Sequence, residues 1–174
     1  MKTIVIYNSQ TGFTKRYAQW IAEETGADCY ELSEAKKKNM DEYEAIIYGG
    51  WACAGGISKL SWFKSNIERW GGKKLIAFCV GASPMESPDV GPALKKNFSE
   101  LEWEKIKVFY CPGGFRYDKM SISSRLLMKM FIKMLEAKKN KTDTEREMIK
   151  MISTSYDISD KKYIEPIVRS LIET

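Results

Sequence analysis

The chain has 174 residues, of which 44% are hydrophobic, and it carries a formal net charge of +5 with no histidine. This length fits a single domain over residues 1–174, and the lack of histidine leaves few ligands for a zinc site, so we expect no metal. No apolar run approaches the roughly 20 residues of a membrane-spanning helix, and a strand pattern begins directly after Lys2. We expect a cytoplasmic protein, and no motif indicates a nucleic-acid partner.

The four cysteines, Cys29, Cys53, Cys79 and Cys111, show no C-x-x-C spacing. We expect them to be reduced, most of them on buried strands. Cys53 stands apart because it lies near a candidate ligand loop.

Strand and helix patterns alternate along the chain. We predict strands at residues 3–7, 29–32, 45–48, 75–80 and 107–111, and helices at 14–24, 58–70, 92–101 and about 160–173. Residues 33–43 are polar and lysine-rich, and predict no more than a short helix or a loop. Five strands separated by helices predict an α/β fold, a doubly wound parallel sheet with helices on both faces.

The first strand is followed by Asn-Ser-Gln-Thr-Gly-Phe-Thr at residues 8–14, directly ahead of the first helix pattern. A helix N-terminus has unpaired N–H groups and a partial positive charge, so it attracts an anion. Gly12 permits close approach of the backbone, and nearby hydroxyls add donors that suit a phosphate monoester. The spacing matches neither the P-loop of NTP-binding proteins nor the dinucleotide motif. An ordinary polar turn with a threonine cap is the alternative.

The pattern Ser-x-Thr-Gly-x-Thr resembles the phosphate loop of flavodoxin-like proteins. The resemblance implies FMN as the cofactor and five parallel strands in the order 2-1-3-4-5, with the ligand at their carboxyl ends. It also implies which residues form the phosphate loop, namely Ser9, Gln10, Thr11, Gly12, Phe13 and Thr14.

Two further loops leave the same edge of the predicted sheet, at residues 49–56 and 81–85. Both contain glycine, which would let backbone groups reach the polar edge of the flavin ring, and Trp51 offers a flat face for stacking. Packing of Trp51 on the body of the protein is the alternative. In flavodoxin-like proteins these loops grip the flavin, and the implied contacts are Gly50, Trp51, Ala52, Cys53, Gly81, Ala82 and Ser83.

The excess positive charge lies in one segment. Residues 116–141 hold eight basic and two acidic residues, whereas the remaining 148 hold twenty basic and twenty-one acidic. Nearly fifty residues separate the fifth strand from the last helix, far more than an ordinary connection needs. We therefore predict an insert at about residues 116–152, with structure of its own.

Within the insert, residues 124–135 predict a helix that places Arg125, Lys129 and Lys133, followed by Glu136, along one mostly basic stripe with a broad apolar surface beside it. Such a helix suits the surface of an anionic membrane or the cover of a hydrophobic site. The alternative is a mostly buried helix whose lysines extend to water.

The insert resembles that of the flavodoxin-like, menaquinone-dependent protoporphyrinogen oxidases. Three segments carry this resemblance: Gly113-Gly114-Phe115-Arg116-Tyr117, residues 128–135 and Lys141-Thr142-Asp143-Thr144. It implies that electrons pass from a porphyrinogen-like molecule through FMN to a quinone, with peripheral contact at the inner face of the membrane as an option. No catalytic side chain is then required, because FMN carries the chemistry.

Arg116 and Tyr117 are candidates for contact with an anionic substrate, the alternative being a salt bridge and a packed aromatic at the insert's root. The ring loops differ from those expected of the oxidases, which are more aromatic and basic. The alternative function is therefore a non-enzymatic electron carrier of the flavodoxin type, whose partner is a redox protein.

Overall fold

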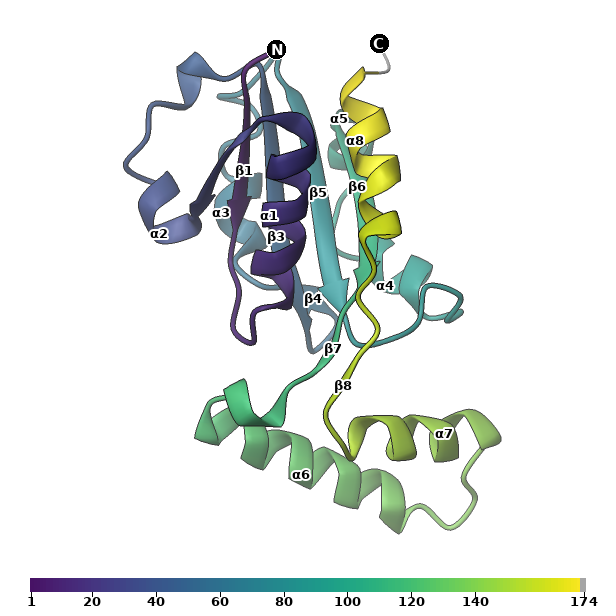
Figure 1. Ribbon diagram of the computed structural model, residues 1–174. Helices are drawn as coiled ribbons and strands as arrows, with labels where there is room; N and C mark the ends of the chain where they lie inside the picture. Colours follow the sequence, from purple (N-terminus) through teal and green to yellow (C-terminus); the bar gives the residue numbers. More distant parts are fainter. Residues whose placement is uncertain (173–174) are drawn as a thin grey trace.

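The computed structural model describes residues 1–172. At its centre lies a parallel sheet in the order β2-β1-β3-β5-β6, which is the predicted flavodoxin-like order (Figure 1). The register is continuous across the middle of the sheet, where Val5 pairs with Ile47 and Ile47 with Ile76. The parallel strands are β1 (Thr3–Tyr7), β2 (Asp28–Glu31), β3 (Ala45–Cys53), β5 (Lys74–Gly81) and β6 (Ile106–Pro112).

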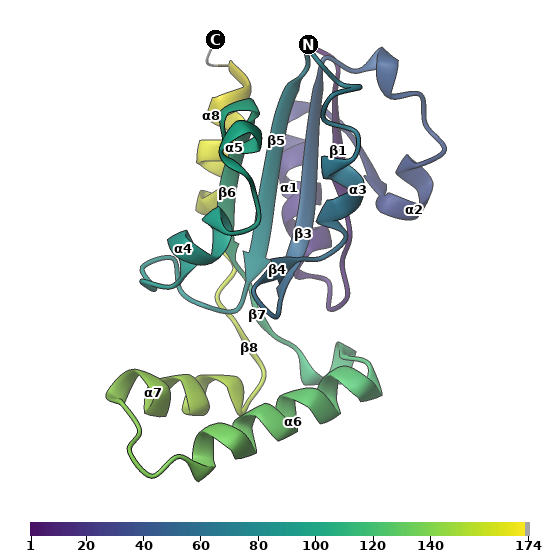
Figure 2. The ribbon, with the colours of Figure 1, turned by 180° about the vertical axis from the view of Figure 1, so that it is seen from behind.

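Helices cover both faces of the sheet (Figures 1 and 2). Alternate side chains of β1 enter two separate cores, because Ile4 and Ile6 pack on one face and Val5 on the other. The Val5 face is covered by α1 (Phe13–Thr25) and α8 (Glu165–Ile172), and the opposite face by α3 (Leu60–Lys64), α4 (Val90–Lys95) and α5 (Glu100–Lys105).

The segment predicted to be a short helix or loop contains α2 (Leu32–Ala35) and the 3₁₀ turn η1 (Met40–Glu42), which confirms the prediction. The last predicted helix is also confirmed, as the turn η3 (Lys161–Ile164) followed by α8. Its predicted last residue, Glu173, lies outside the described residues.

The helix predicted at 58–70 is wrong in length, since α3 ends at Lys64 and is followed by turns. The carbonyl of Trp62 accepts hydrogen bonds from the side chains of Ser65, at 2.9 Å, and Asn66, at 2.8 Å. These side chains occupy the carbonyl that the next turn of a regular helix would use.

The helix predicted at 92–101 is two helices, α4 and α5. A capping box starts the second one, because the Ser99 hydroxyl accepts the Glu102 N–H at 3.3 Å and the Glu102 carboxylate accepts the Ser99 N–H at 2.7 Å. Ser99 itself is extended, so the chain leaves the first helix before it begins the second.

Strand β3 is longer than predicted, because it continues to Cys53 through the glycines that we had placed in a loop. It then turns back through Ala54 and Gly55, which both have positive φ, to the short antiparallel strand β4 (Gly56–Ile57). The predicted glycine loop is thus mostly a β-hairpin.

The predicted insert is present as a stalk that bears two helices (Figure 1). Strand β7 (Gly114–Phe115) pairs antiparallel with β8 (Tyr156–Asp157) to form the stalk. Between them lie the turn η2 (Tyr117–Lys119) and helices α6 (Ile122–Ala137) and α7 (Asp143–Ile152). Both figures place this helix pair beyond the carboxyl edge of the sheet.

Helix α6 is largely exposed, so the alternative of a mostly buried helix is wrong. Leu135 is its one buried residue. Five apolar side chains between 39% and 65% exposed form what we call the apolar strip: Leu126, Leu127, Met130, Phe131 and Met134. In the described part of the chain, no helix is both long and apolar enough to cross a membrane.

Candidate functional site

Helix α1 begins directly beneath the carboxyl end of β1 with an N-terminus that no side chain caps. Its N-cap residue is Gly12, with φ 97° and ψ −14°, a conformation that favours glycine. Ser99, Ser121 and Thr142 cap α5, α6 and α7 with their hydroxyls, whereas the shorter helices α2, α3 and α4 lack a side-chain cap, as α1 does. The first N–H groups of α1 are therefore left for a ligand, as an anion site requires.

The side chains of the predicted phosphate loop differ in their surroundings. Ser9 accepts the Gly12 N–H at 3.2 Å and so shapes the loop. No hydrogen bond of the Thr11 or Thr14 hydroxyl is found within the described part of the chain. Thr11 is partly exposed and can serve a ligand, whereas Thr14 is buried, with an exposed fraction of 1%. Phe13 is likewise buried in the core, and the Gln10 side chain donates to Ser124 of the insert at 3.1 Å.

The two predicted ring loops lie side by side and line a half-open cavity of about 200 Å³. Residues predicted for the flavin contribute from both loops, with Ala52 from the β3 hairpin and Ala82 and Ser83 from the segment after β5. Asp89, Asn97 and Tyr110 also line it, although the sequence did not single them out.

Of these three, Asn97 holds the hairpin: its side-chain amide donates to the Gly55 carbonyl at 3.0 Å, and its oxygen accepts the Ile57 N–H at 3.1 Å. No sequence signal marks a contact over forty residues of separation, so residue patterns could not have found it.

The glycines of the ring loops serve packing as well as ligand approach. A Cβ on Gly50 would lie 2.6 Å from Ile57, and one on Gly81 would lie 2.5 Å from the Tyr110 hydroxyl. Both glycines are buried. We had assigned them to the flavin alone, and the structure shows that they admit neighbouring side chains.

Trp51 and Cys53 lie on the β3 hairpin, where Trp51 is half-buried and Cys53 is exposed. The Trp51 N–H donates to the Ser58 hydroxyl at 3.0 Å, which fixes its backbone. Its flavin-stacking role and the packing alternative both stay predictions.

The cysteines carry no disulfide. Cys79 and Cys111 are buried, whereas Cys29 is half-buried and Cys53 is exposed, so two of the four cysteines are buried and not most of them. Burial raises the pKa of the Cys29 thiol to about 11 and that of Cys79 to about 12, so neither is a thiolate at neutral pH.

The insert's stalk contacts both parts of this site. On one side, Arg16 of α1 forms an ion pair with Asp157 of β8 at 2.6 Å. On the other, the Tyr156 hydroxyl donates to the Ala82 carbonyl of a ring loop at 2.6 Å. The insert is thus joined to the edge of the sheet where the cofactor loops meet.

The two predicted substrate contacts have different surroundings. The Tyr117 hydroxyl donates to the Ile152 carbonyl and its ring stacks on Phe115, so this side chain fits the packed-aromatic alternative. Burial raises the pKa of its phenol. Arg116 instead lies at the phosphate loop, with its guanidinium carbon 5.6 Å from the Phe13 ring centroid.

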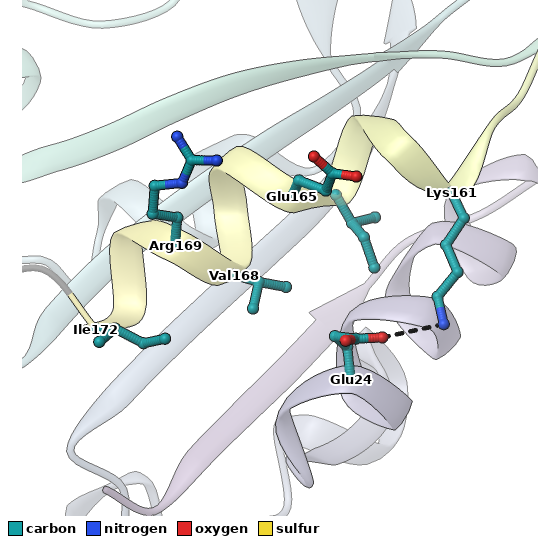
Figure 3. Close-up of a pocket in the computed structure, with 7 residues that line it drawn as sticks. Glu24, Lys161, Glu165, Val168, Arg169 and Ile172 are labelled. Carbon is teal, nitrogen blue, oxygen red and sulfur yellow. Dashed lines mark ion pairs between the residues drawn. The ribbon is translucent and has the colours of Figure 1, made fainter.

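A larger hollow of about 550 Å³ lies between α8 and the last turn of α1, at the opposite end of α1 from the phosphate loop (Figure 3). An ion pair between Lys161 and Glu24 spans it at 3.0 Å. The described residues contain no cluster of side chains that could hold a metal ion.

Comparison with known proteins agrees with the geometry. The model of the flavodoxin domain family matches residues 4–145. The chain belongs to this family. The match supports FMN as the cofactor, and the uncapped N-terminus of α1 fits the FMN phosphate.

The chain is also similar to several solved structures. A WrbA-like flavodoxin from Agrobacterium tumefaciens is 21% identical, with 71% of this chain and 87% of that chain covered and a TM-score of 0.42. The Trp repressor binding protein from Bacillus subtilis is 15% identical, with coverages of 68% and 88% and a TM-score of 0.48. A flavoprotein in complex with FMN from Lactobacillus acidophilus NCFM is 18% identical, with coverages of 64% and 91% and a TM-score of 0.43. No curated protein matches the chain significantly.

Proposed function

We propose that this protein is an FMN-dependent oxidoreductase that passes electrons from a reduced substrate to a quinone or another acceptor. In this proposed electron transfer through FMN, it resembles the menaquinone-dependent protoporphyrinogen oxidases. FMN supplies the redox chemistry when it is bound. The chain positions the cofactor through the N-terminus of α1 and the two ring loops, and it exposes an apolar strip nearby for a hydrophobic partner.

The observation that supports this proposal is the surface of α6. In soluble proteins, a contiguous apolar strip on the surface marks an interaction site. Exposure of large apolar side chains to water is unfavourable, and contact with a partner relieves it. Arg125, Lys129 and Lys133 form a basic stripe on the same helix. Together they fit the headgroups and acyl chains of an anionic membrane, which is where a quinone is found.

The stalk explains how such a surface could serve the redox site. Asp157 holds the stalk to α1, and Tyr156 holds it to the ring loop that follows β5. The insert is therefore kept close to the cofactor edge of the sheet. An acceptor dissolved in the membrane would then be presented to the flavin side of the sheet.

The electron-carrier alternative is favoured by one observation, the size of the cavity between the ring loops. At about 200 Å³ it is smaller than the roughly 300–1,000 Å³ typical of small-molecule sites. A carrier needs no substrate pocket, since electrons can pass at an exposed edge of the flavin.

Anaerobic reduction of the FMN-loaded protein separates the two functions. The reduced or oxidised protein is mixed in turn with a soluble quinone, with protoporphyrinogen and with redox carrier proteins, and the flavin absorbance is followed by stopped flow. We expect the fastest exchange with the quinone. Faster exchange with carrier proteins than with either small molecule would instead establish the electron-carrier function.

A further inference from the structure

Arg116 lies against the phosphate loop although the two are separated by about a hundred residues. Its Nη1 atom is 3.8 Å from the position that a Cβ would take on Gly12, the N-cap residue of α1. Its guanidinium also lies over the Phe13 ring, at 5.6 Å. A cation of the insert thus stands beside the partial positive charge of the uncapped helix end.

The backbone around Arg116 is fixed on both sides. Before it, Gly114 packs so closely on β8 that a Cβ would lie 2.1 Å from the Tyr156 carbonyl oxygen, and it has φ 143°. After it, the Tyr117 N–H donates to the Ser155 hydroxyl at 3.1 Å, and the Tyr117 hydroxyl donates to Ile152. The position of Arg116 therefore follows from the stalk.

A second arginine on the same ring provides an internal comparison. The guanidinium of Arg16 lies 5.5 Å from the Phe13 centroid, and its charge is balanced by Asp157 at 2.6 Å. For Arg116, no carboxylate lies within ion-pair distance among residues 1–172. Two positive groups, Arg116 and the α1 N-terminus, therefore face one another without an anion, which is unfavourable until an anion binds.

We propose that Arg116 binds the phosphate of FMN from the insert's side and completes the site that the α1 N-terminus begins. A guanidinium suits a phosphate because it offers paired donors in a planar fork and stays charged at any physiological pH. Arg116 is then a cofactor-binding residue and not the substrate contact that the sequence suggested. This proposal rests on FMN being the cofactor.

The insert and the cofactor would then be coupled. Gln10 already links the phosphate loop to Ser124 of α6, and Arg116 would add a bond through the bound phosphate. Since coupling between two binding events is reciprocal, FMN would hold the insert in place as the insert holds FMN.

The test compares FMN with riboflavin, which lacks the phosphate. Dissociation constants are measured on the apoprotein by flavin fluorescence, for the wild type, Arg116→Gln, Arg116→Lys and Lys139→Gln. Lys139 is exposed in the same insert, between α6 and α7, so this control removes the same charge away from the loop. No turnover is needed for this measurement.

We expect Arg116→Gln to weaken FMN binding about 10- to 100-fold, in the range of a lost charge-assisted hydrogen bond, and to leave riboflavin binding unchanged. Arg116→Lys should lose less affinity, and Lys139→Gln should bind FMN like the wild type. Unchanged riboflavin binding also reports that the variants are folded.

Two results would overturn the proposal for Arg116 and leave the cofactor assignment intact. In one, Arg116→Gln weakens the binding of FMN and of riboflavin equally; in the other, Arg116→Gln binds FMN as tightly as the wild type does. A wild-type protein that binds neither flavin would overturn both.

Discussion

Gly12 has the most demanding backbone conformation in the phosphate loop. With φ 97° at the N-cap of α1, it adopts angles that a residue with a Cβ takes only with strain. We predict that Gly12→Ala lowers the free energy of unfolding by about 1–3 kcal/mol and weakens FMN binding. Denaturant unfolding and flavin titration measure the two effects.

Gly26 provides the control for this substitution, since it lies at the other end of α1 with φ 66° and has no atom within 4 Å of a Cβ position. Gly26→Ala should destabilise the protein through similar strain but leave the dissociation constant of FMN unchanged. If both variants bound FMN equally well, Gly12 would have no special part in the cofactor site.

Residue types alone did not reveal the neighbours of each side chain. The Ser-x-Thr-Gly-x-Thr spacing predicted a phosphate site, and the structure places an uncapped helix end there. The same motif assigns Gln10 and Phe13 to the phosphate loop in the same way as the hydroxyl-bearing residues. Only the fold shows that Phe13 enters the core and that Gln10 contacts the insert, because both outcomes depend on distant residues.

At the scale of elements, local hydrogen bonds decided where helices begin and end. Ser99 and Glu102 have the serine-x-x-glutamate spacing of a capping box, which would have predicted the start of α5. The prediction of one helix at residues 92–101 instead extends a single helical pattern through this point. The early end of α3 was harder to foresee, since it depends on which of several carbonyls Ser65 and Asn66 select.

The stalk strand β8 is fastened to α1 by Asp157, and this contact should respond to acid. Although burial alone would raise the pKa of Asp157, hydrogen bonds from Ser159 and Arg16 lower it overall. A carboxyl with a lowered pKa stabilises the fold above its unfolded pKa of about 3.9, and this stabilisation is lost as the pH falls through the lower folded value.

We therefore predict that Asp157→Asn is less stable than the wild type at pH 5–7 and that the difference shrinks below about pH 4. Melting temperatures of both proteins across this range measure it. A difference that stayed constant down to pH 3 would mean that the charge of Asp157 does not fasten the stalk.

For the whole molecule, the main consequence of the fold is where it puts the positive charge. The chain outside residues 116–141 is close to neutral, and this segment carries the excess on α6 and on the turns that flank it, beyond the cofactor edge (Figure 2). Attraction to an anionic surface would therefore orient the molecule with α6 toward that surface.

We predict that the protein binds vesicles that contain anionic lipid, and that it binds more weakly to neutral vesicles or at raised ionic strength. Met130→Glu, in the apolar strip, should reduce binding about tenfold or more, because burial of a methionine contributes about 1.5–3 kcal/mol. Asn140→Glu, exposed in the turn after α6, adds the same charge and should bind much more strongly than Met130→Glu. Sedimentation with vesicles measures binding in each of these cases.

The wild type could fail to bind anionic vesicles while Met130→Glu changed the rate of electron exchange with a soluble quinone. The apolar strip would then contact the redox site and would not bind a membrane. In that case α6 would act as part of a substrate pocket.

The sequence by itself determined the alternating fold, the strand order through its family resemblance, the phosphate loop and the existence of the insert. These features follow from hydrophobic periodicity and from residues adjacent in the chain, which act locally. Only the tertiary structure decided that Arg116 lies beside Gly12, that Tyr117 packs at the insert's root and that α6 stays exposed. Each of these depends on how the β7–β8 stalk folds back on α1, and such long-range contacts leave no pattern in neighbouring residues.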